Sequence, residues 1–119
     1  MKRDMDLIRT LLLQVEENPA HLSREAPHAD GYSPEVIAEH AKLLIQAGLV
    51  DGTDASTRAG PMFLLHSLTW QGHEFLEVAR NETIWKKGVA VVQEKGLGMG
   101  FDVLKAVLTK LAQAAIGLP

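Results

Sequence analysis

The sequence contains no cysteine, which excludes disulfide bonds, thiolate nucleophiles and metal sites with cysteine ligands. Its five histidines follow no spacing typical of a zinc site, so we expect neither a metal nor another cofactor. Long apolar runs are also absent, and no stretch approaches the ~18 residues that a membrane-spanning helix needs. The apolar run near the start contains Asp4 and Asp6, and no small-residue cleavage site follows it. These absences predict a cytoplasmic protein without a signal peptide or membrane association.

Neither sign of charge dominates the sequence, but the charges are unevenly distributed. Residues 1–79 contain six Lys and Arg against twelve Asp and Glu, a net charge of −6, whereas residues 80–119 contain six against three, a net charge of +3. With 119 residues, 46% hydrophobic and 23% charged, the chain otherwise has the size and composition of one globular domain. The asymmetry is compatible with self-association or a charged partner, and also with ordinary solvated surfaces.

The first predicted helix covers residues 4–17, where apolar residues recur at helical spacing. Asp4 and Asp6 favour its N-terminal end because negative charge stabilises the positive end of the helix dipole. Residues 18–32 contain prolines, a glycine and polar turn formers, so we expect mostly loop there. A short strand at residues 20–24 is the alternative for part of this segment.

A second helix is predicted to begin after Ser33, a good N-cap, with Pro34 at the first helical position. It runs to about Ala47. Gly48 is placed for a left-handed C-terminal cap, with Leu49 folding back on the last turn. Both ends of this helix are therefore defined by local chemistry.

A β-hairpin is predicted after this helix. One strand begins at Leu49 and Val50, and a second, apolar strand covers Met62–Leu68 after the breaker at Gly60 and Pro61. The polar, turn-rich residues between them connect the two strands, so we expect an antiparallel pair.

The apolar strand runs through Thr69 directly into a helix that reaches about Arg80. The Thr69 side chain can cap the free N–H groups of that helix. Gly72 removes a side chain in the first turn and so lets another backbone come close. The inward face of the helix is predicted to contain four apolar residues, namely Trp70, Phe75, Leu76 and Ala79.

Two further helical segments are predicted in the C-terminal part. Asn81 can cap the first, although that segment could also continue the preceding helix. Glycines at 96, 98 and 100 then act as a hinge before an amphipathic helix over residues 101–116. We therefore expect a domain over residues 1–95, and a hinge and helix over 96–119 that packs on the body or forms a homodimer interface. The residues expected in that interface are Phe101, Leu104, Val107, Leu108 and Leu111.

The segments "LLIQAGLV" and "LTWQGHEFL", separated by a polar tip and an apolar strand, resemble the winged-helix domains. In that pattern a helix ends in an A-G-L-[VI] turn, a hairpin wing follows, and an L-T-x-x-G-x-x-[FL]-L helix closes the unit. The resemblance implies an α+β, mostly helical fold: a winged-helix-like domain with a small antiparallel β-hairpin and extra C-terminal helices. The segment 18–32 departs from the pattern, since Pro19, Pro27 and Gly31 interrupt the place of a short helix.

The whole chain resembles the DUF2513 family of small bacterial and prophage proteins more closely. The segments that carry this resemblance are MKRDMDLIRTLLLQVEE, YSPEVIAEHAKLLIQAGLV and LTWQGHEFLEVARNETIWKK. The resemblance covers roughly residues 1–110. It implies a winged-helix-like fold and a bacterial or mobile-element origin, and it implies no catalytic residues.

DNA binding would require basic and amide side chains on the helix after Ser33 and on the hairpin tip. The helix carries Glu35 and Glu39 against Lys42, and the tip carries two aspartates against one arginine, so each has a net charge of −1. DNA is therefore disfavoured. If DNA is bound, the expected contacts are Lys42, Gln46 and Arg58, helped by Lys2 and Arg3.

No cluster of polar residues indicates catalysis, so we expect a protein that is not an enzyme. The leading hypothesis is a small binding module that acts through protein contacts or self-association. The alternative is a winged-helix DNA-binding transcriptional regulator.

Overall fold

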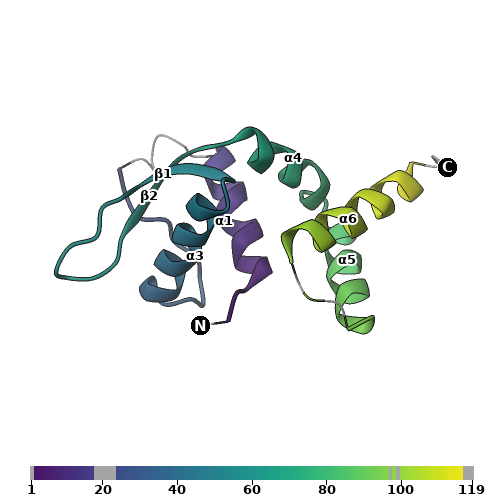
Figure 1. Cartoon of the computed structure of the whole chain (residues 1–119), viewed down its shortest axis with the longest axis horizontal. Coiled ribbons are helices and arrows are strands. Elements are labelled where there is room, and N and C mark those ends of the chain that lie inside the picture. Colours follow the sequence, from purple (N-terminus) through teal and green to yellow (C-terminus); the bar gives the residue numbers. More distant parts are fainter. Residues whose placement is uncertain (1, 18–23, 97, 99, 117–119) are drawn as a thin grey trace. The chain divides into compact units, whose positions relative to one another are not determined.

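The structure is a computed structural model that describes residues 2–17, 24–96, 98 and 100–116 (Figure 1). Along the chain the elements are α1 (Met5–Glu17), α3 (Pro34–Gln46), β1 (Val50–Asp54), β2 (Phe63–Leu68), α4 (Trp70–Ala79), α5 (Glu82–Glu94) and α6 (Phe101–Ala115). β1 and β2 form a two-stranded antiparallel sheet. The predicted α+β, mostly helical class with a small hairpin and extra C-terminal helices is confirmed. The winged-helix resemblance stays a prediction.

The chain separates into two compact units, Met1–His73 and Glu74–Pro119, with the boundary inside α4. In the first unit, α1 and α3 pack against each other and against the hairpin. The apolar residues of these elements form the core of the unit; its fully buried members include Leu7, Leu11, Leu12, Ala41, Leu44 and Leu65. The predicted division after residue 95 stays a prediction.

Helix α3 begins and ends as its local sequence predicts. The Ser33 side chain accepts a hydrogen bond from the Val36 N–H at 3.2 Å, and Pro34 occupies the first helical position. At the other end Gly48 has φ of +75°. The Gly48 N–H donates to the Ile45 carbonyl at 3.1 Å, and the Leu49 N–H donates to the Leu44 carbonyl at 3.0 Å. This pair of bonds is a Schellman motif, which turns the chain from α3 into the hairpin.

The hairpin is paired further towards its tip than the sequence predicts. Val50 lies opposite Leu68 and Asp54 opposite Phe63, with an irregular register between Asp51 and Gly52. Beyond the strands, Thr57 and Gly60 exchange two backbone hydrogen bonds of 3.1 Å. The polar segment therefore forms a narrow loop that extends past α3 (Figure 1). Its first residues belong to β1, because cross-strand pairing with the apolar β2 brings polar residues into a strand.

The joint between β2 and α4 is confirmed in detail. Thr69 accepts a hydrogen bond from the Gly72 N–H at 3.1 Å and donates its hydroxyl to the Gly48 carbonyl at 2.5 Å. The Thr69 N–H also donates to the Leu49 carbonyl at 3.0 Å. A Cβ at position 72 would lie 2.1 Å from that same Leu49 oxygen. The absence of a side chain at Gly72 therefore lets the backbone before β1 approach the first turn of α4.

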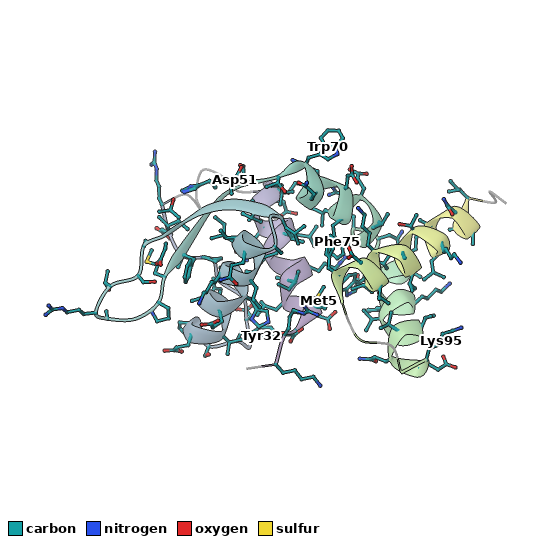
Figure 2. The ribbon with its side chains drawn as sticks, viewed as in Figure 1. Met5, Tyr32, Asp51, Trp70, Phe75 and Lys95 are labelled. Atoms are coloured by element: carbon teal, nitrogen blue, oxygen red, sulfur yellow. The ribbon has the colours of Figure 1, made fainter. Side chains whose placement is uncertain are left out.

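The prediction that Trp70 lies on the inward face of α4 is wrong. Phe75, Leu76 and Ala79 are fully buried, but Trp70 is 76% exposed and points away from the helix (Figure 2). At ~100° per residue, position 70 lies ~140° around the helix axis from position 75. The apolar face of α4 therefore begins after its first turn.

The second unit is built on an aromatic cluster and the packing of α5 on α6. The ring of Phe75 lies edge-on to Trp85 at 6.2 Å and 4.7 Å from the ring of Phe101. Asn81 caps α5 by accepting a hydrogen bond from the Ile84 N–H at 3.0 Å, so α4 and α5 are separate helices. Leu104 and Leu108 of α6 are fully buried, and Leu108 lies against Gly88 of α5.

The predicted loop at residues 18–32 is described only from residue 24 onward, where the chain has turns and irregular structure. The alternative strand at residues 20–24 falls almost entirely outside the described residues. Among the helices that the structure describes, none is long and apolar enough to cross a membrane.

Candidate functional site

A groove with a volume of about 430 Å³ lies between α3 and the hairpin. We call it the α3/hairpin groove. Its lining combines apolar, amide, hydroxyl and charged side chains: Glu39, Lys42, Ile45 and Gln46 from α3, and Asp54, Ser56, Pro61 and Phe63 from the hairpin. The groove therefore presents apolar surface together with charges of both signs.

Helical spacing places the α3 members of the lining on one side of the helix. Glu39, Lys42 and Gln46 follow one another at intervals of three and four residues, which puts them on one face. Ile45 lies beside this row and packs against the hairpin at Gly52, where an added Cβ would meet its Cδ1 atom at 2.6 Å. The contact at Gly52 brings the hairpin close to α3 beside the groove.

The carboxylate of Asp54 is held by the turn that follows β1. Asp54 Oδ1 accepts a hydrogen bond from the Ser56 N–H at 2.9 Å. Hydrogen bonds from the Ser56 side chain and backbone, together with the positive charge of Lys42, lower the pKa of Asp54. Ser56 Oγ in turn accepts a hydrogen bond from the Met62 N–H at 3.1 Å. Asp54 is thus an ionised group in a defined position on the groove wall.

The residues predicted to contact DNA are only partly brought together. Lys42 and Gln46 both line the groove. Arg58 lies exposed in the hairpin loop, outside the lining, and Lys2 and Arg3 are exposed before the start of α1. The groove also contains Glu39 and Asp54, which the sequence analysis did not place together. Only the approach of the hairpin to α3 reveals that combination.

A second polar cluster, the Asp4 network, joins the start of α1 to α3. Asp4 caps α1 by accepting hydrogen bonds from the Asp6 and Leu7 N–H groups at 2.9 and 3.2 Å. Its other carboxylate oxygen accepts a hydrogen bond from the Tyr32 hydroxyl at 2.7 Å. The sequence gives no sign of this network, because its members are far apart in the chain and match no motif.

His40 completes the Asp4 network from α3. It is fully buried; its Nε2 accepts a hydrogen bond from the Asp4 N–H at 2.9 Å, and its Nδ1 lies 2.8 Å from the Val36 carbonyl oxygen. A carbonyl only accepts, so Nδ1 carries the proton and the imidazole is neutral. Both ring nitrogens are occupied within the protein, which makes His40 a structural residue.

The Asp4 network changes the ionisation of Tyr32 and Asp4. The hydrogen bond to Asp4, followed by burial and the negative charge of Asp4, raises the pKa of Tyr32 to about 12. Burial alone would raise the pKa of Asp4, but hydrogen bonds from Tyr32, Leu7 and Asp6 outweigh it and leave that pKa lowered. Tyr32 therefore stabilises the fold below its unfolded pKa near 10, and this contribution is lost as pH rises through about 12. The contribution of Asp4 is fully present above its usual pKa and is lost as pH falls through its lowered pKa in the folded protein.

Tyr32 is the single tyrosine of the chain, so an alkaline titration followed by tyrosinate absorbance reports it directly. We expect a pKa of about 12 for the native protein. Asp4→Asn removes the negative charge and should move the pKa down towards 10. Asp54→Asn, in the hairpin, is the matched control and should leave it unchanged. A native pKa near 10 would contradict the hydrogen bond.

Comparison with known proteins places the chain in a family. The family described as "Hypothetical protein (DUF2513)" matches residues 2–98, most of the chain. The chain belongs to the DUF2513 family. It is also 36% identical over 108 residues to a protein of Haemophilus influenzae named "Uncharacterized protein", covering 90% of this chain and 92% of that protein. No solved structure matches.

The DUF2513 match includes the α3/hairpin groove and the Asp4 network and ends before α6. Of the residues predicted to form a dimer interface on α6, Leu104 and Leu108 are buried within the chain. Phe101, Val107 and Leu111 are half-buried. The exposed large apolar residues of this segment are Val103 and Ile116. An interface on α6 of this DUF2513 protein stays a prediction.

Among the described residues of this DUF2513 protein, no group of three or more His, Asp or Glu side chains is placed to hold a metal ion. His66 in β2 lies 2.8 Å from the Thr53 hydroxyl across the hairpin. His28 pairs with Asp30 at 3.0 Å on the surface. The described histidines with these contacts, like His40, have local partners of their own.

Proposed function

We propose that this protein is a binding module that acts through protein contacts, without catalysis, and that its contact surface is the α3/hairpin groove. The observation that supports this proposal is the composition of the groove lining. Ile45, Pro61 and Phe63 supply apolar surface, and the amide and charged groups around them can fix the orientation of a bound chain. A concave surface of this mixed kind suits a peptide segment, because apolar contacts contribute affinity and polar contacts contribute specificity.

The charge of the same surface argues against DNA as the partner. α3 carries two glutamates against Lys42, and residues 51–61 carry two aspartates against Arg58. Nonspecific affinity for DNA comes mainly from Lys and Arg contacts with phosphates. Lys42 shares the groove with the carboxylates of Glu39 and Asp54 and helps to lower the pKa of Asp54. These negative charges make the surroundings of Lys42 less favourable to a phosphate.

We therefore expect no binding of generic duplex DNA by fluorescence anisotropy, even at low salt. If DNA does bind, phosphate contacts predict an affinity that falls steeply with salt. Binding that is lost in Lys42→Glu/Arg58→Glu but kept in the control Lys86→Glu/Lys87→Glu, exposed on α5, would contradict the proposal.

The alternative function is a DNA-binding transcriptional regulator. One observation favours it: Lys42 and Gln46, the amine and amide expected to contact DNA, lie together on the groove face of α3. Arg58 in the hairpin loop would supply a phosphate contact on this alternative. The anisotropy experiment separates the two functions, because only the regulator requires these three side chains for binding to DNA.

A further inference from the structure

We propose that the α3/hairpin groove binds a short protein segment that presents a lysine or arginine to Glu39 and lays an apolar side chain on Phe63 and Ile45. This inference rests on the proposed function, and it specifies the chemistry of the partner. It follows from three properties of the groove: its net charge, the internal partners of its charged groups and the position of its apolar surface.

The lining has two carboxylates against one ammonium group, which gives a net charge of −1. The two carboxylates differ in their surroundings. Asp54 accepts a hydrogen bond from the Ser56 N–H, and the positive charge of Lys42 helps to lower its pKa. The carboxylate of Glu39, within the part of the chain that the structure describes, has no hydrogen bond or ion pair. Glu39 is therefore the groove carboxylate whose negative charge has no partner within the described part of the protein. A positively charged group on a bound segment would complement it.

The apolar part of the lining suits the stem of a lysine or arginine. Ile45 and Phe63 are half-buried and Pro61 is exposed, so apolar atoms of the groove remain in contact with solvent. The methylene stem of Lys or Arg covers apolar surface while its charged head stays near water or a carboxylate. An anionic segment would gain the same apolar contact but would bring its charge towards Glu39 and Asp54, which is unfavourable.

The experiment is a selection from a library of short random peptides displayed on phage, with the full-length protein as bait. Counter-selection uses Gln46→Trp, in which an indole at an exposed position of α3 fills the groove. Circular dichroism checks that this variant keeps the native helical content. We expect the peptides that bind the native protein but not Gln46→Trp to be enriched in Lys or Arg next to an apolar residue.

The selected peptides are then synthesised and titrated against two neutralising variants on the same helix. Glu39→Gln should weaken binding about two- to fivefold, the range typical of an exposed ion pair. Glu35→Gln, one turn earlier, exposed and outside the lining, should leave the affinity unchanged. The native affinity should also fall as salt rises, because exposed charges are screened.

The outcomes separate this inference from the proposed function. Groove-dependent peptides without enrichment in Lys or Arg, or with an affinity that Glu39→Gln does not change, overturn the inference and leave the groove as a protein-contact surface. If no selected peptide loses binding in Gln46→Trp, the groove is not the contact surface, and the proposed function fails with it.

Discussion

Replacement of Gly72 by alanine is expected to lower the free energy of unfolding by about 3 kcal/mol, near the upper end of the range for overpacking substitutions. The added Cβ would lie 2.1 Å from the Leu49 carbonyl oxygen, far inside van der Waals contact. The oxygen cannot simply rotate away, because it accepts the hydrogen bond from the Thr69 N–H. Either the start of the hairpin or the first turn of α4 must shift. Denaturant unfolding followed by circular dichroism measures the loss.

The control for this substitution is Gly98→Ala. An added Cβ at Gly98 would meet no atom within 4 Å, so its effect on stability should be small. An intermediate effect is expected for Gly88→Ala, where the nearest atom, at 2.6 Å, is the terminal Cδ2 of Leu108. A Gly72→Ala protein as stable as the native one would show that the two backbones do not approach as closely as described.

Replacement of His40 by alanine is expected to lower the free energy of unfolding by a similar amount, about 3 kcal/mol. The imidazole is fully buried, so its removal leaves a cavity. It also removes the acceptor of the Asp4 N–H and the donor to the Val36 carbonyl. The loss should loosen the start of α1 as well as α3, because Asp4 caps α1. Thermal unfolding and amide hydrogen exchange at Asp6 and Leu7 measure the two effects.

His73→Ala is the matched control for His40→Ala. His73 is exposed on α4, so its substitution should change stability by less than about 0.5 kcal/mol. An equal effect of the two substitutions would contradict a structural role for His40. A destabilised His40→Ala protein with unchanged exchange at Asp6 and Leu7 would place the loss in the cavity alone.

The features that the sequence predicted correctly depend on short stretches of chain. Ser33, Asn81 and Gly48 each end or begin a helix through a hydrogen bond or a backbone conformation that involves residues at most four positions away. Thr69 and Gly72 were also predictable from a short stretch of chain. Thr69 caps the helix that directly follows it, and the absence of a side chain at Gly72 indicates that another backbone comes close to the first turn of α4. The residue that makes this approach, Leu49, is visible only in the structure.

Two sequence-based expectations differ from the structure for identifiable reasons. Trp70 is expected on the inward face together with Phe75, although the positions of these two residues around the helix axis differ by ~140°. Residues 51–61 are expected only to connect the two strands, because they are polar and turn-rich. Pairing depends on the partner strand, and the apolar β2 extends the ladder to Asp54.

Only part of the candidate site could be predicted from the sequence. Lys42 and Gln46 could be named because helical spacing puts them on one face of α3. Their position opposite Asp54, Ser56 and Phe63 depends on the Schellman turn at Gly48 and on the contact of Ile45 with Gly52. The approach of the hairpin places Lys42 in a groove with two carboxylates, and its role as a DNA contact stays a prediction.

The class of the fold, both ends of α3 and the joint between β2 and α4 can be predicted from the sequence, because they follow from hydrogen bonds and periodicity within a few residues. Tertiary structure alone decided the rest. It brought Asp4, Tyr32 and His40 together across 36 positions of the chain. It also left Glu39 as the groove carboxylate without an internal partner. Charge and burial act through distances in space, and only the packing of α1, α3 and the hairpin determines those distances.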